Sequence, residues 1–404
     1  MRTSAIICEF NPFHRGHERL VRFAREKGAD RIVCIMSGNF VQRGEPAIAD
    51  KYTRAKAAVL SGADLVLELP MPFSAASAEY FARAGASIAD RLGFADELVF
   101  GSELGESEEL TKIAENQLSA DFCERLKEIH SGEIGYAVAV QRAYEELYGK
   151  NDALTTPNNI LAIEYIKALR GRSSNMTVRT VAREDNYSSA ELSGEYPSAT
   201  ALRKLIYSGE MERTADGIPV GAYKAFAEAL AKGTFPIDMS KYGFILLSAM
   251  RLALPEMLSE CEGVCGGLEN RIIQSALASA SYDEFLSMLS TKKYTDARLR
   301  RALLAAFIGV KHSDMLIDPC YVKLLAASGE GRELLATLRK NKNIAAVTKV
   351  SDIKDIISGL EGEKKAQTVR LYEINKRCDA LYSLCLPKTK NAFFFDKMSP
   401  FVEK

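Results

Sequence analysis

The sequence predicts an α/β fold in which a parallel, doubly wound sheet is followed by a mostly α-helical region. Over the first hundred residues, short apolar runs alternate with segments of helical periodicity. These runs are nearly continuous, as in strands that are buried on both faces of a parallel sheet. From about residue 220 onward, apolar residues recur at helical spacing, as in "RLRRALLAAFIGV" (298–310). Because 404 residues are too many for one ordinary core, we expect one domain at 1–215 and a second at 216–404.

The elements of the first domain follow one another as β-α steps. Strands are expected at residues 4–9, 31–36, 64–69, 96–101 and 176–183, and helices at 16–27, 51–62 and 77–92. Residues 107–170 have a helical pattern, and Thr156 with Pro157 provides a start signal for its last helix. Residues 196–206 read as a loop that enters a short helix. Ligands of such sheets bind beyond the carboxyl ends of the strands, so the loops at those ends are expected to form one site.

The composition excludes several classes of protein. The 53 basic and 53 acidic residues cancel, so the whole-chain charge predicts no polyanionic partner, and any basic patch must be local. No apolar run approaches the ~20 residues of a membrane-spanning helix, and the N-terminus lacks a signal-type apolar segment. We therefore expect a cytoplasmic protein with no membrane association. The eight cysteines are scattered, which is typical of reduced thiols.

The stretch "CEFNPFHRGH" (8–17) holds two of the four histidines. His14 and His17 are spaced so that both side chains can point toward one spot at the start of a helix, and Gly16 allows a close approach to the backbone. Free N–H groups and the helix dipole make that spot attractive to phosphate. Two imidazoles there would add donors that follow charge building on phosphorus oxygens. The alternative is that these histidines only cap the helix or pack the turn.

The second loop, "SGNFVQRGEPAIADKYTRAKAA" (37–58), follows the second expected strand. Its glycines at 38 and 44 permit a backbone that wraps a ligand. Its side chains offer hydrogen-bond donors suited to a triphosphate or a carboxylate, namely Gln42, Arg43, Lys51 and Arg54. The alternative for this segment is a solvated surface loop.

Three later segments complete the expected site. "FGSE" (100–103) places Gly101 where an adenine or ribose could lie against the main chain, although many strands end in glycine. "PNN" (157–159) and Arg183 are equally explained as a helix start and a surface cation. In "SATALR" (198–203), Ser198 and Thr200 can cap a helix whose N-terminus would hold the β and γ phosphates, and a plain helix cap is the alternative.

A basic stretch, "TKKYTDARLRR" (291–301), stands in the helical region. Its cations are Lys292, Lys293, Arg298, Arg300 and Arg301. Tyr294 offers an aromatic surface for stacking on a base. A neutral chain with cations gathered in one domain can bind RNA there, although most such runs are only solvated faces.

Together these segments resemble the bacterial tRNA(Met) cytidine acetate ligases, which belong to the wider HxGH nucleotidyltransferase superfamily. The resemblance is carried by "CEFNPFHRGH", "SGNFVQRGEPAIADKYTRA", "GADLVLELP", "SAEYFA", "FGSE", "PNNILAIEY", "SATALR", "GLENRI" and "KKYTDARLRR". The H-x-G-H pattern alone would indicate only the superfamily, whereas "SGNFVQRGEPA" with "DLVLELP" is far more specific. The motifs span most of the chain in the order of the family.

The resemblance implies a Rossmann-like parallel-sheet nucleotidyltransferase domain followed by a mostly α-helical C-terminal domain. It implies a two-step ligase in which acetate attacks ATP to give acetyl-adenylate and pyrophosphate. The N4 amine of the wobble cytidine of elongator tRNA(Met) then takes the acetyl group, which makes N4-acetylcytidine and releases AMP. The implied partners are acetate, ATP and the tRNA(Met) anticodon loop, which the helical domain would help to hold. We expect Mg²⁺ to accompany ATP, without assigned metal ligands.

The residues carried over by matching motif are those of an ATP site. They are Ile7, Asn11, Pro12, Phe13, His14, Gly16, His17, Leu20, Gly101, Asn158 and Arg183. Asn158 is preferred to its neighbour Asn159 because it directly follows the proline. We expect four catalytic residues: His14, His17, Arg43 and Lys51. The roles of Arg43 and Lys51 are inferred from position and chemistry, as are phosphate contacts for Ser198 and Thr200.

Two other functions remain open on the sequence. One is a small-molecule nucleotidyltransferase that joins AMP to a phosphorylated metabolite. The other is a non-catalytic RNA-binding or scaffold protein with a degenerate nucleotide fold. The sequence leaves open the determinants of tRNA selection and the oligomeric state. It also leaves open whether a residue acts as general base in acetyl transfer, because the amine could lose its proton to solvent after attack.

Overall fold

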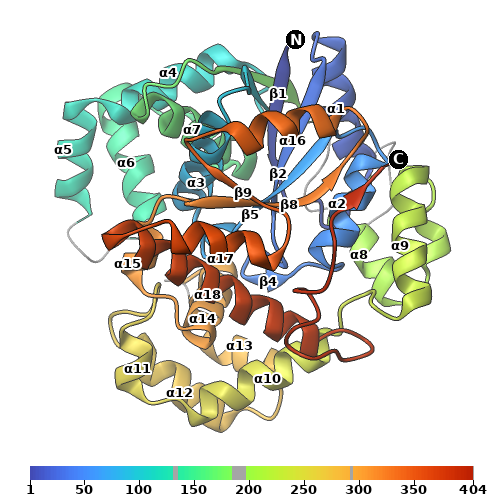
Figure 1. Ribbon diagram of the computed structural model, residues 1–404. Coiled ribbons are helices and arrows are strands. Elements are labelled where there is room, and N and C mark those ends of the chain that lie inside the picture. Colours follow the sequence, from blue (N-terminus) through green and yellow to red (C-terminus); the bar gives the residue numbers. More distant parts are fainter. Residues whose placement is uncertain (131–134, 184–196, 292–293, 404) are drawn as a thin grey trace.

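The fold is built around a mixed sheet whose strands come from both ends of the chain (Figure 1). The computed structural model describes residues 1–130, 135–183, 197–291 and 294–403. The sheet strands are β1 (Thr3–Cys8), β2 (Arg31–Ser37), β5 (Leu65–Leu69), β6 (Glu97–Ser102), β7 (Thr177–Ala182), β8 (Tyr321–Ala327), β9 (Ala345–Val347) and β10 (Phe401–Val402). Their order is β10-β8-β5-β2-β1-β6-β7, with β9 beside β8. A separate two-stranded ribbon joins β3 (Phe40–Val41) and β4 (Glu45–Pro46).

The centre of the sheet is parallel and changes direction at β1. The chain runs from β1 to β2 and then to β5 on one side, and returns to place β6 and β7 on the other. A crevice opens at such a switch point, beyond the carboxyl ends of the two diverging strands. The five strands expected from the sequence up to residue 183 are confirmed, and the carboxyl ends of β1 and β6 mark the place where a ligand site is expected.

Both faces of the central strands are buried. In β1, Ile6 packs in one hydrophobic cluster and Ala5 and Ile7 in another, because successive side chains point to opposite faces. The same alternation divides β2. This double burial explains why the strands read as continuous apolar runs in the sequence.

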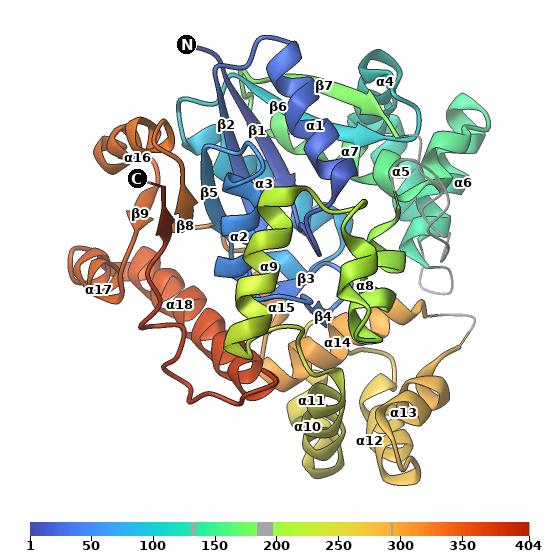
Figure 2. The same cartoon turned by 90° about the vertical axis from the view of Figure 1, so that its right-hand side faces the viewer.

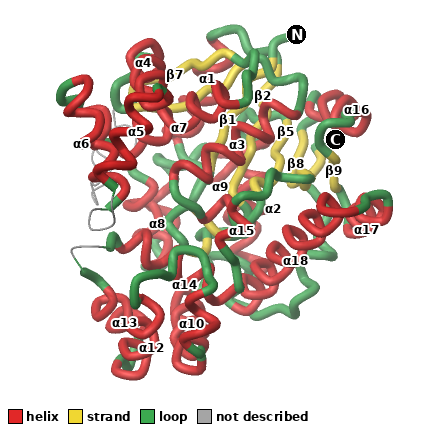
Figure 3. Tube along the Cα trace, turned by 90° about the vertical axis from the view of Figure 1, so that its left-hand side faces the viewer, coloured by secondary structure: helices red, strands yellow, loops and turns green. Residues whose placement is uncertain are grey.

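Helices cover both faces of the sheet, and a further group of helices lies away from the strands (Figure 1 and Figure 3). In the first half they are α1 (Arg15–Glu26), α2 (Lys51–Val59), α3 (Ala78–Arg91), α4 (Ser107–Leu118), α5 (Ala120–Ile129), α6 (Tyr136–Tyr148), α7 (Pro157–Gly171) and α8 (Ala199–Tyr207). In the second half they are α9 (Val220–Lys232), α10 (Met239–Leu252), α11 (Pro255–Ser259), α12 (Leu268–Ala278), α13 (Tyr282–Leu289), α14 (Asp296–Ile308), α15 (His312–Met315), α16 (Gly331–Lys340), α17 (Val350–Ser358) and α18 (Gly362–Leu384). Figure 3 shows helices and loops around α10, α12 and α13, away from the strands.

The C-terminal part is mostly helical, as expected, but it also completes the sheet. β8 pairs antiparallel with β5, and β10 and β9 each pair parallel with β8. These strands were not predicted from the sequence. Residues from both sides of the expected boundary at 215 therefore share one sheet, and the division into domains at that residue stays a prediction.

The structure also bears on membrane-spanning helices and on the state of the cysteines. Within the described ranges, none of the helices combines the length and the apolar character needed to cross a membrane. All eight cysteines are free thiols.

Candidate active site

A cavity opens at the switch point of the sheet, beyond β1 and β6. It encloses about 1270 Å³, its open mouth included. Its walls come from the end of β1, the start of α1, the β3–β4 ribbon, β6, α7, the residue after β7 and the start of α8. Figure 2 shows α1 and α8 on the same side of the molecule as the ribbon. Most of the residues expected in the site line this cavity: Ile7, Asn11, His14, His17, Leu20, Arg43, Gly101, Asn158, Arg183, Ser198 and Thr200.

The two histidines both cap α1 and face the cavity. His14 is the N-cap, and its Nδ1 accepts a hydrogen bond of 3.0 Å from the Gly16 N–H. The His14 N–H in turn donates to Nδ1 of His17 at 3.3 Å, and the two rings lie 3.9 Å apart. Because Nδ1 is the acceptor in each ring, a neutral imidazole carries its proton on Nε2. The helix cap therefore leaves each histidine with one N–H donor to offer to a ligand.

The surroundings keep both rings neutral. Burial, followed by the charges of Arg183 and Arg203, lowers the pKa of His14 to about 3. Burial also lowers the pKa of His17, and the neighbouring His14 and Arg183 act in the same direction. At neutral pH the two imidazoles are thus uncharged hydrogen-bond donors, and the positive charges of Arg183 and Arg203 lie near them.

Three expected residues of the first loop support the site from behind instead of lining it. Phe13 is fully buried, and its ring lies 4.7 Å from that of Phe10 and 5.6 Å from His17. Pro12 is also buried. Gly16 contributes the N–H that fixes His14. These residues shape the turn, which positions the two imidazoles.

The second loop reaches the cavity through the ribbon, where Val41, Gln42, Arg43 and Glu45 line it. The two loop glycines meet protein atoms instead of a ligand. A Cβ on Gly38 would lie 2.5 Å from Oε1 of Glu68, and one on Gly44, where φ is +76°, would lie 2.5 Å from the backbone nitrogen of Arg301. The glycines therefore let the loop pack closely against β5 and α14.

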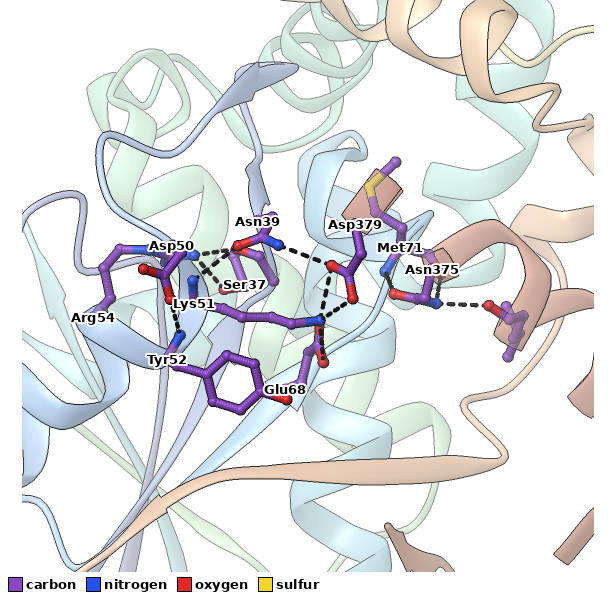
Figure 4. A network of polar contacts seen from close by, with 12 residues as sticks. Ser37, Asn39, Asp50, Lys51, Tyr52, Arg54, Glu68, Met71, Asn375 and Asp379 are labelled. Carbon is purple, nitrogen blue, oxygen red and sulfur yellow. Dashed lines mark hydrogen bonds and ion pairs between the residues drawn. The ribbon is translucent and has the colours of Figure 1, made fainter. Parts of the chain in front are cut away.

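Lys51, which was expected to act in catalysis, is placed away from this cavity. Its ammonium is buried between Glu68 of β5 and Asp379 of α18, each 2.8 Å away (Figure 4). Burial alone would lower the pKa of Lys51, but the two carboxylates outweigh it and raise the pKa. Since these partners occupy its donors, Lys51 joins the end of the chain to the sheet and does not reach the cavity.

Arg54 is likewise a structural cation. Its fully buried guanidinium donates to the carbonyls of Ala49 at 2.9 Å and Ser37 at 3.0 Å, and to the carbonyls of Gly38 and Glu9. It thereby ties the first loop to the second.

Gly101, Asn158 and Arg183 form one wall. Nη1 of Arg183 donates to Oδ1 of Asn158 at 3.2 Å, and a Cβ on Gly101 would lie 3.1 Å from Cγ of Arg183. Glu103 accepts from the side chain of Asn158 at 2.7 Å. The neighbouring Asn159 is buried and accepts from the Leu104 N–H at 3.1 Å, so Asn158 is the one of the pair that lines the cavity.

The start of α8 forms the facing wall. Ser198 caps the helix by accepting from the Ala201 N–H at 3.1 Å. Arg203, one turn on, donates to the Asn11 carbonyl at 2.7 Å and to Thr200 at 3.1 Å. Two helix N-termini, those of α1 and α8, therefore meet at the cavity, and both favour negative charge.

The sequence analysis missed several lining residues. Phe81, Phe100, Leu161 and Tyr165 give the cavity an apolar side, and Glu9 and Glu45 are its carboxylates. Glu9 lies within the quoted "CEFNPFHRGH" motif, directly after β1, and that position was a signal for it. The apolar residues carry no such signal, because their types and spacing also fit an ordinary core.

In the described part of the basic stretch of the helical region, the three arginines contact other residues of the protein. Arg300 pairs with Glu45 at 2.6 Å, and Arg301 donates to the Gln42 carbonyl at 3.3 Å. The guanidinium of Arg298 lies over the ring of Tyr294, which is itself buried. Lys292 and Lys293 lie outside the described residues. The expected stacking surface on Tyr294 is thus covered by Arg298.

The chemistry of the cavity follows from these walls. Neutral imidazole donors, the guanidinium groups of Arg43, Arg183 and Arg203, and two helix N-termini suit a chain of phosphates. The apolar side suits a flat ring. Across the described residues, no group of three or more His, Cys, Asp or Glu side chains gathers to hold a metal ion.

The chain is similar to known proteins over most of its length. A family model described as HIGH Nucleotidyl Transferase matches residues 1–394. The tRNA(Met) cytidine acetate ligase of Thermoanaerobacter sp. (strain X514) is 36% identical over 362 residues, which cover 87% of this chain and 90% of the relative. That of Clostridium perfringens (strain SM101 / Type A) is 34% identical over 409 residues, or 96% and 97% of the two chains.

Two solved structures are similar over their whole length. Apo Thermotoga maritima TmcAL (form I) matches with a TM-score of 0.94 and 28% identity, covering 100% of both chains. The same protein bound with alpha-thio ATP (form II) matches with a TM-score of 0.92 and the same identity and coverage.

Proposed function

The chain belongs to the HIGH nucleotidyl transferase family and, within it, to the tRNA(Met) cytidine acetate ligases, and from this premise we propose its reaction. It is an ATP-dependent ligase that activates acetate as acetyl-adenylate with release of pyrophosphate. It then transfers the acetyl group to N4 of the wobble cytidine of elongator tRNA(Met), which gives N4-acetylcytidine and AMP. Acetate itself is a poor acylating agent, whereas its mixed anhydride with AMP is a good one, so ATP is chemically required.

The observation that carries this proposal is the pair of Nε2–H donors at the switch point. They stand at the start of α1, close to the guanidinium groups of Arg183 and Arg203. Donors that are already aimed at the phosphates stabilise the charge that develops when pyrophosphate leaves, without reorganisation during the reaction. The neighbour bound with alpha-thio ATP supports a nucleotide in this fold.

We assign the parts of ATP by the chemistry of the walls. The triphosphate lies against His14, His17 and the start of α8, with Arg43 and Arg203 beside it. The base and ribose lie on the side of Gly101 and Asn158 and of the apolar residues. Arg183 donates to Asn158 and its charge also acts on His14, so it serves both this side and the phosphates. Mg²⁺ would enter with the triphosphate, because this ion is bound largely by phosphate oxygens and water and needs few protein ligands.

The RNA partner is the anticodon loop of tRNA(Met), which we expect to be held in part by the C-terminal helices. A wobble base is single-stranded, so it can be splayed into the cavity without breaking a duplex. The mouth of the cavity is the route by which the cytidine amine would reach an acetyl-adenylate bound inside.

A nucleoside assay tests the proposed function. The chain is incubated with ATP, Mg²⁺, labelled acetate and tRNA, and the RNA is digested to nucleosides. We expect labelled N4-acetylcytidine and pyrophosphate release that depends on acetate. Pyrophosphate release that depends on a phosphorylated metabolite instead, with no labelled nucleoside, would identify a small-molecule nucleotidyltransferase.

A further inference from the structure

The second step of the proposed reaction releases a proton, and a residue that accepts it would speed the transfer. When the cytidine amine attacks the acetyl carbonyl, a C–N bond forms, the C–O bond to the phosphate breaks, and AMP leaves with that electron pair. The attacking nitrogen must also lose one of its two protons before the amide is complete. A side chain that takes this proton must line the cavity and must offer a free acceptor.

The histidines do not meet this requirement. Nδ1 of His14 already accepts from Gly16, and Nδ1 of His17 accepts from the His14 N–H. Their remaining ring nitrogens carry hydrogen, so both imidazoles act as donors toward the cavity. Histidine is the most common general base in enzymes, but His14 and His17 act here as hydrogen-bond donors.

The other titratable side chains that line the cavity are also excluded. The Cys8 thiol donates to the Ile35 carbonyl, and burial raises its pKa well above the ordinary value. Burial likewise raises the pKa of Tyr165. Glu45 also has acceptor positions to spare, but its carboxylate is ion-paired with Arg300 at 2.6 Å, whereas no ion pair among the described residues holds Glu9. The arginines are cations and offer no acceptor.

We propose that Glu9 is the catalytic base that removes the proton from the cytidine N4 amine during acetyl transfer. Glu9 directly follows β1, lines the same cavity as the two histidines, and accepts a hydrogen bond of 2.5 Å from the Gln42 N–H. A carboxylate has about four acceptor positions, so this bond leaves others for the amine. The proposal rests on the proposed function, since it names the base for its second step.

The electrostatic setting suits this role. Burial raises the pKa of Glu9, and the Gln42 N–H and three arginines oppose that rise. A base is most effective when its pKa approaches the working pH, so the rise strengthens Glu9 as a proton acceptor. The charged and titratable groups near it are Cys8, which precedes it in the chain, and Arg43, Arg54, Tyr165 and Arg203 from neighbouring elements.

The test separates the two steps in the variant Glu9→Gln. The first step is measured as acetate-dependent exchange of pyrophosphate into ATP. The second is measured as single-turnover transfer of labelled acetyl from enzyme-bound acetyl-adenylate to tRNA. We expect exchange to be nearly unchanged and transfer to fall by about 10²–10⁴, the range for loss of a general base. The amide keeps an oxygen that accepts from Gln42, so we expect the fold to be retained.

Two further variants keep the test sharp. Glu9→Asp retains a carboxylate that is set back, so transfer should fall less than in Glu9→Gln and should still decline as the pH is lowered. In Glu9→Gln the same acidic decline should be absent. Glu18→Gln removes a carboxylate of α1 that pairs with Arg15 at 3.3 Å outside the cavity, and both steps should be unchanged.

Two results would overturn the role of Glu9. One is transfer by Glu9→Gln at the wild-type rate. The other is an equal fall of exchange and transfer, which would place Glu9 in nucleotide or metal binding or in the fold. Failure of the proposed function itself is distinguishable, because then the wild-type chain would show neither acetate-dependent exchange nor labelled N4-acetylcytidine.

Discussion

His14 and His17 combine structure and chemistry in the same rings. Their Nδ1 atoms satisfy backbone donors at the start of α1, and this hydrogen bonding determines which nitrogen faces the cavity. A cap that fixes the tautomer also orients the donor, so the alternatives raised from the sequence, helix cap or phosphate ligand, do not exclude each other.

The first prediction replaces each histidine by asparagine. Asparagine is a favoured N-cap, so His14→Asn should change the free energy of unfolding by less than about 1 kcal/mol. Each variant loses a positioned donor, and acetate-dependent pyrophosphate exchange should fall by about 10²–10³. Rates within a few-fold of wild type in folded variants would show that the imidazoles do not act on the phosphates.

The second prediction concerns pH. His14 has a pKa of about 3 in the folded chain and about 6.5 when unfolded, so between these values the unfolded state binds more protons. Its contribution to stability is therefore lost as the pH falls through this window. Urea unfolding at pH 7 and pH 5 should show a smaller loss for His14→Asn than for wild type. An identical loss would mean that folding does not lower the pKa of His14.

At the scale of elements, the loop that brings Arg43 to the cavity is held from behind by three C-terminal helices. Tyr242 of α10 donates to the Gly44 carbonyl at 3.4 Å, Arg301 of α14 to Gln42 at 3.3 Å, and Tyr382 of α18 to Ala47 at 2.8 Å. The helices that we expect to hold RNA thus also set one wall of the cavity proposed to bind ATP.

The third prediction tests the buried cation of this assembly. Lys51→Met leaves the carboxylates of Glu68 and Asp379 buried without their partner, which should cost about 3–5 kcal/mol of unfolding free energy. Lys56→Met, in the same helix, removes only a partly exposed pair with Glu228 and should cost no more than about 1 kcal/mol. Equal costs in urea unfolding would contradict a structural role for Lys51.

The fourth prediction compares two arginines of α14. Arg301→Ala removes a donor to the Gln42 carbonyl, so the ribbon should loosen and the KM for ATP should rise several-fold. Arg298→Ala should leave that KM unchanged, because its guanidinium lies over Tyr294. Steady-state kinetics with ATP varied at saturating acetate distinguish the two. A KM for ATP that is unchanged in Arg301→Ala would show that α14 does not set this wall.

At the scale of the whole molecule, the sequence predicted the elements that are determined by a local pattern of apolar residues. The strands from β1 to β7 in the main sheet are confirmed, since continuous apolar runs between helical segments identify them. β8 was missed because "YVKLLAA" is a short apolar run that fits a buried helix equally well, and only its pairing with β5 makes it a strand.

Site residues were predictable where a short sequence motif at a strand end or helix start indicates them. The histidines, Gly101 and Asn158 lie at strand ends or helix starts, and the sheet brings those ends together. The burial of Lys51 was not predictable, because its partner Asp379 stands 328 residues further along the chain. The position of Glu9 directly after the first strand was visible in the sequence. The role proposed for it was not, because its electrostatic environment depends on arginines from other elements.

The central claim is that the triphosphate of ATP lies against the Nε2–H groups of His14 and His17. A crystal structure of this chain with an ATP analogue tests it most directly. The account predicts phosphate oxygens within about 3.2 Å of both Nε2 atoms, at the starts of α1 and α8. Phosphates bound elsewhere, or imidazoles turned away from them, would contradict it.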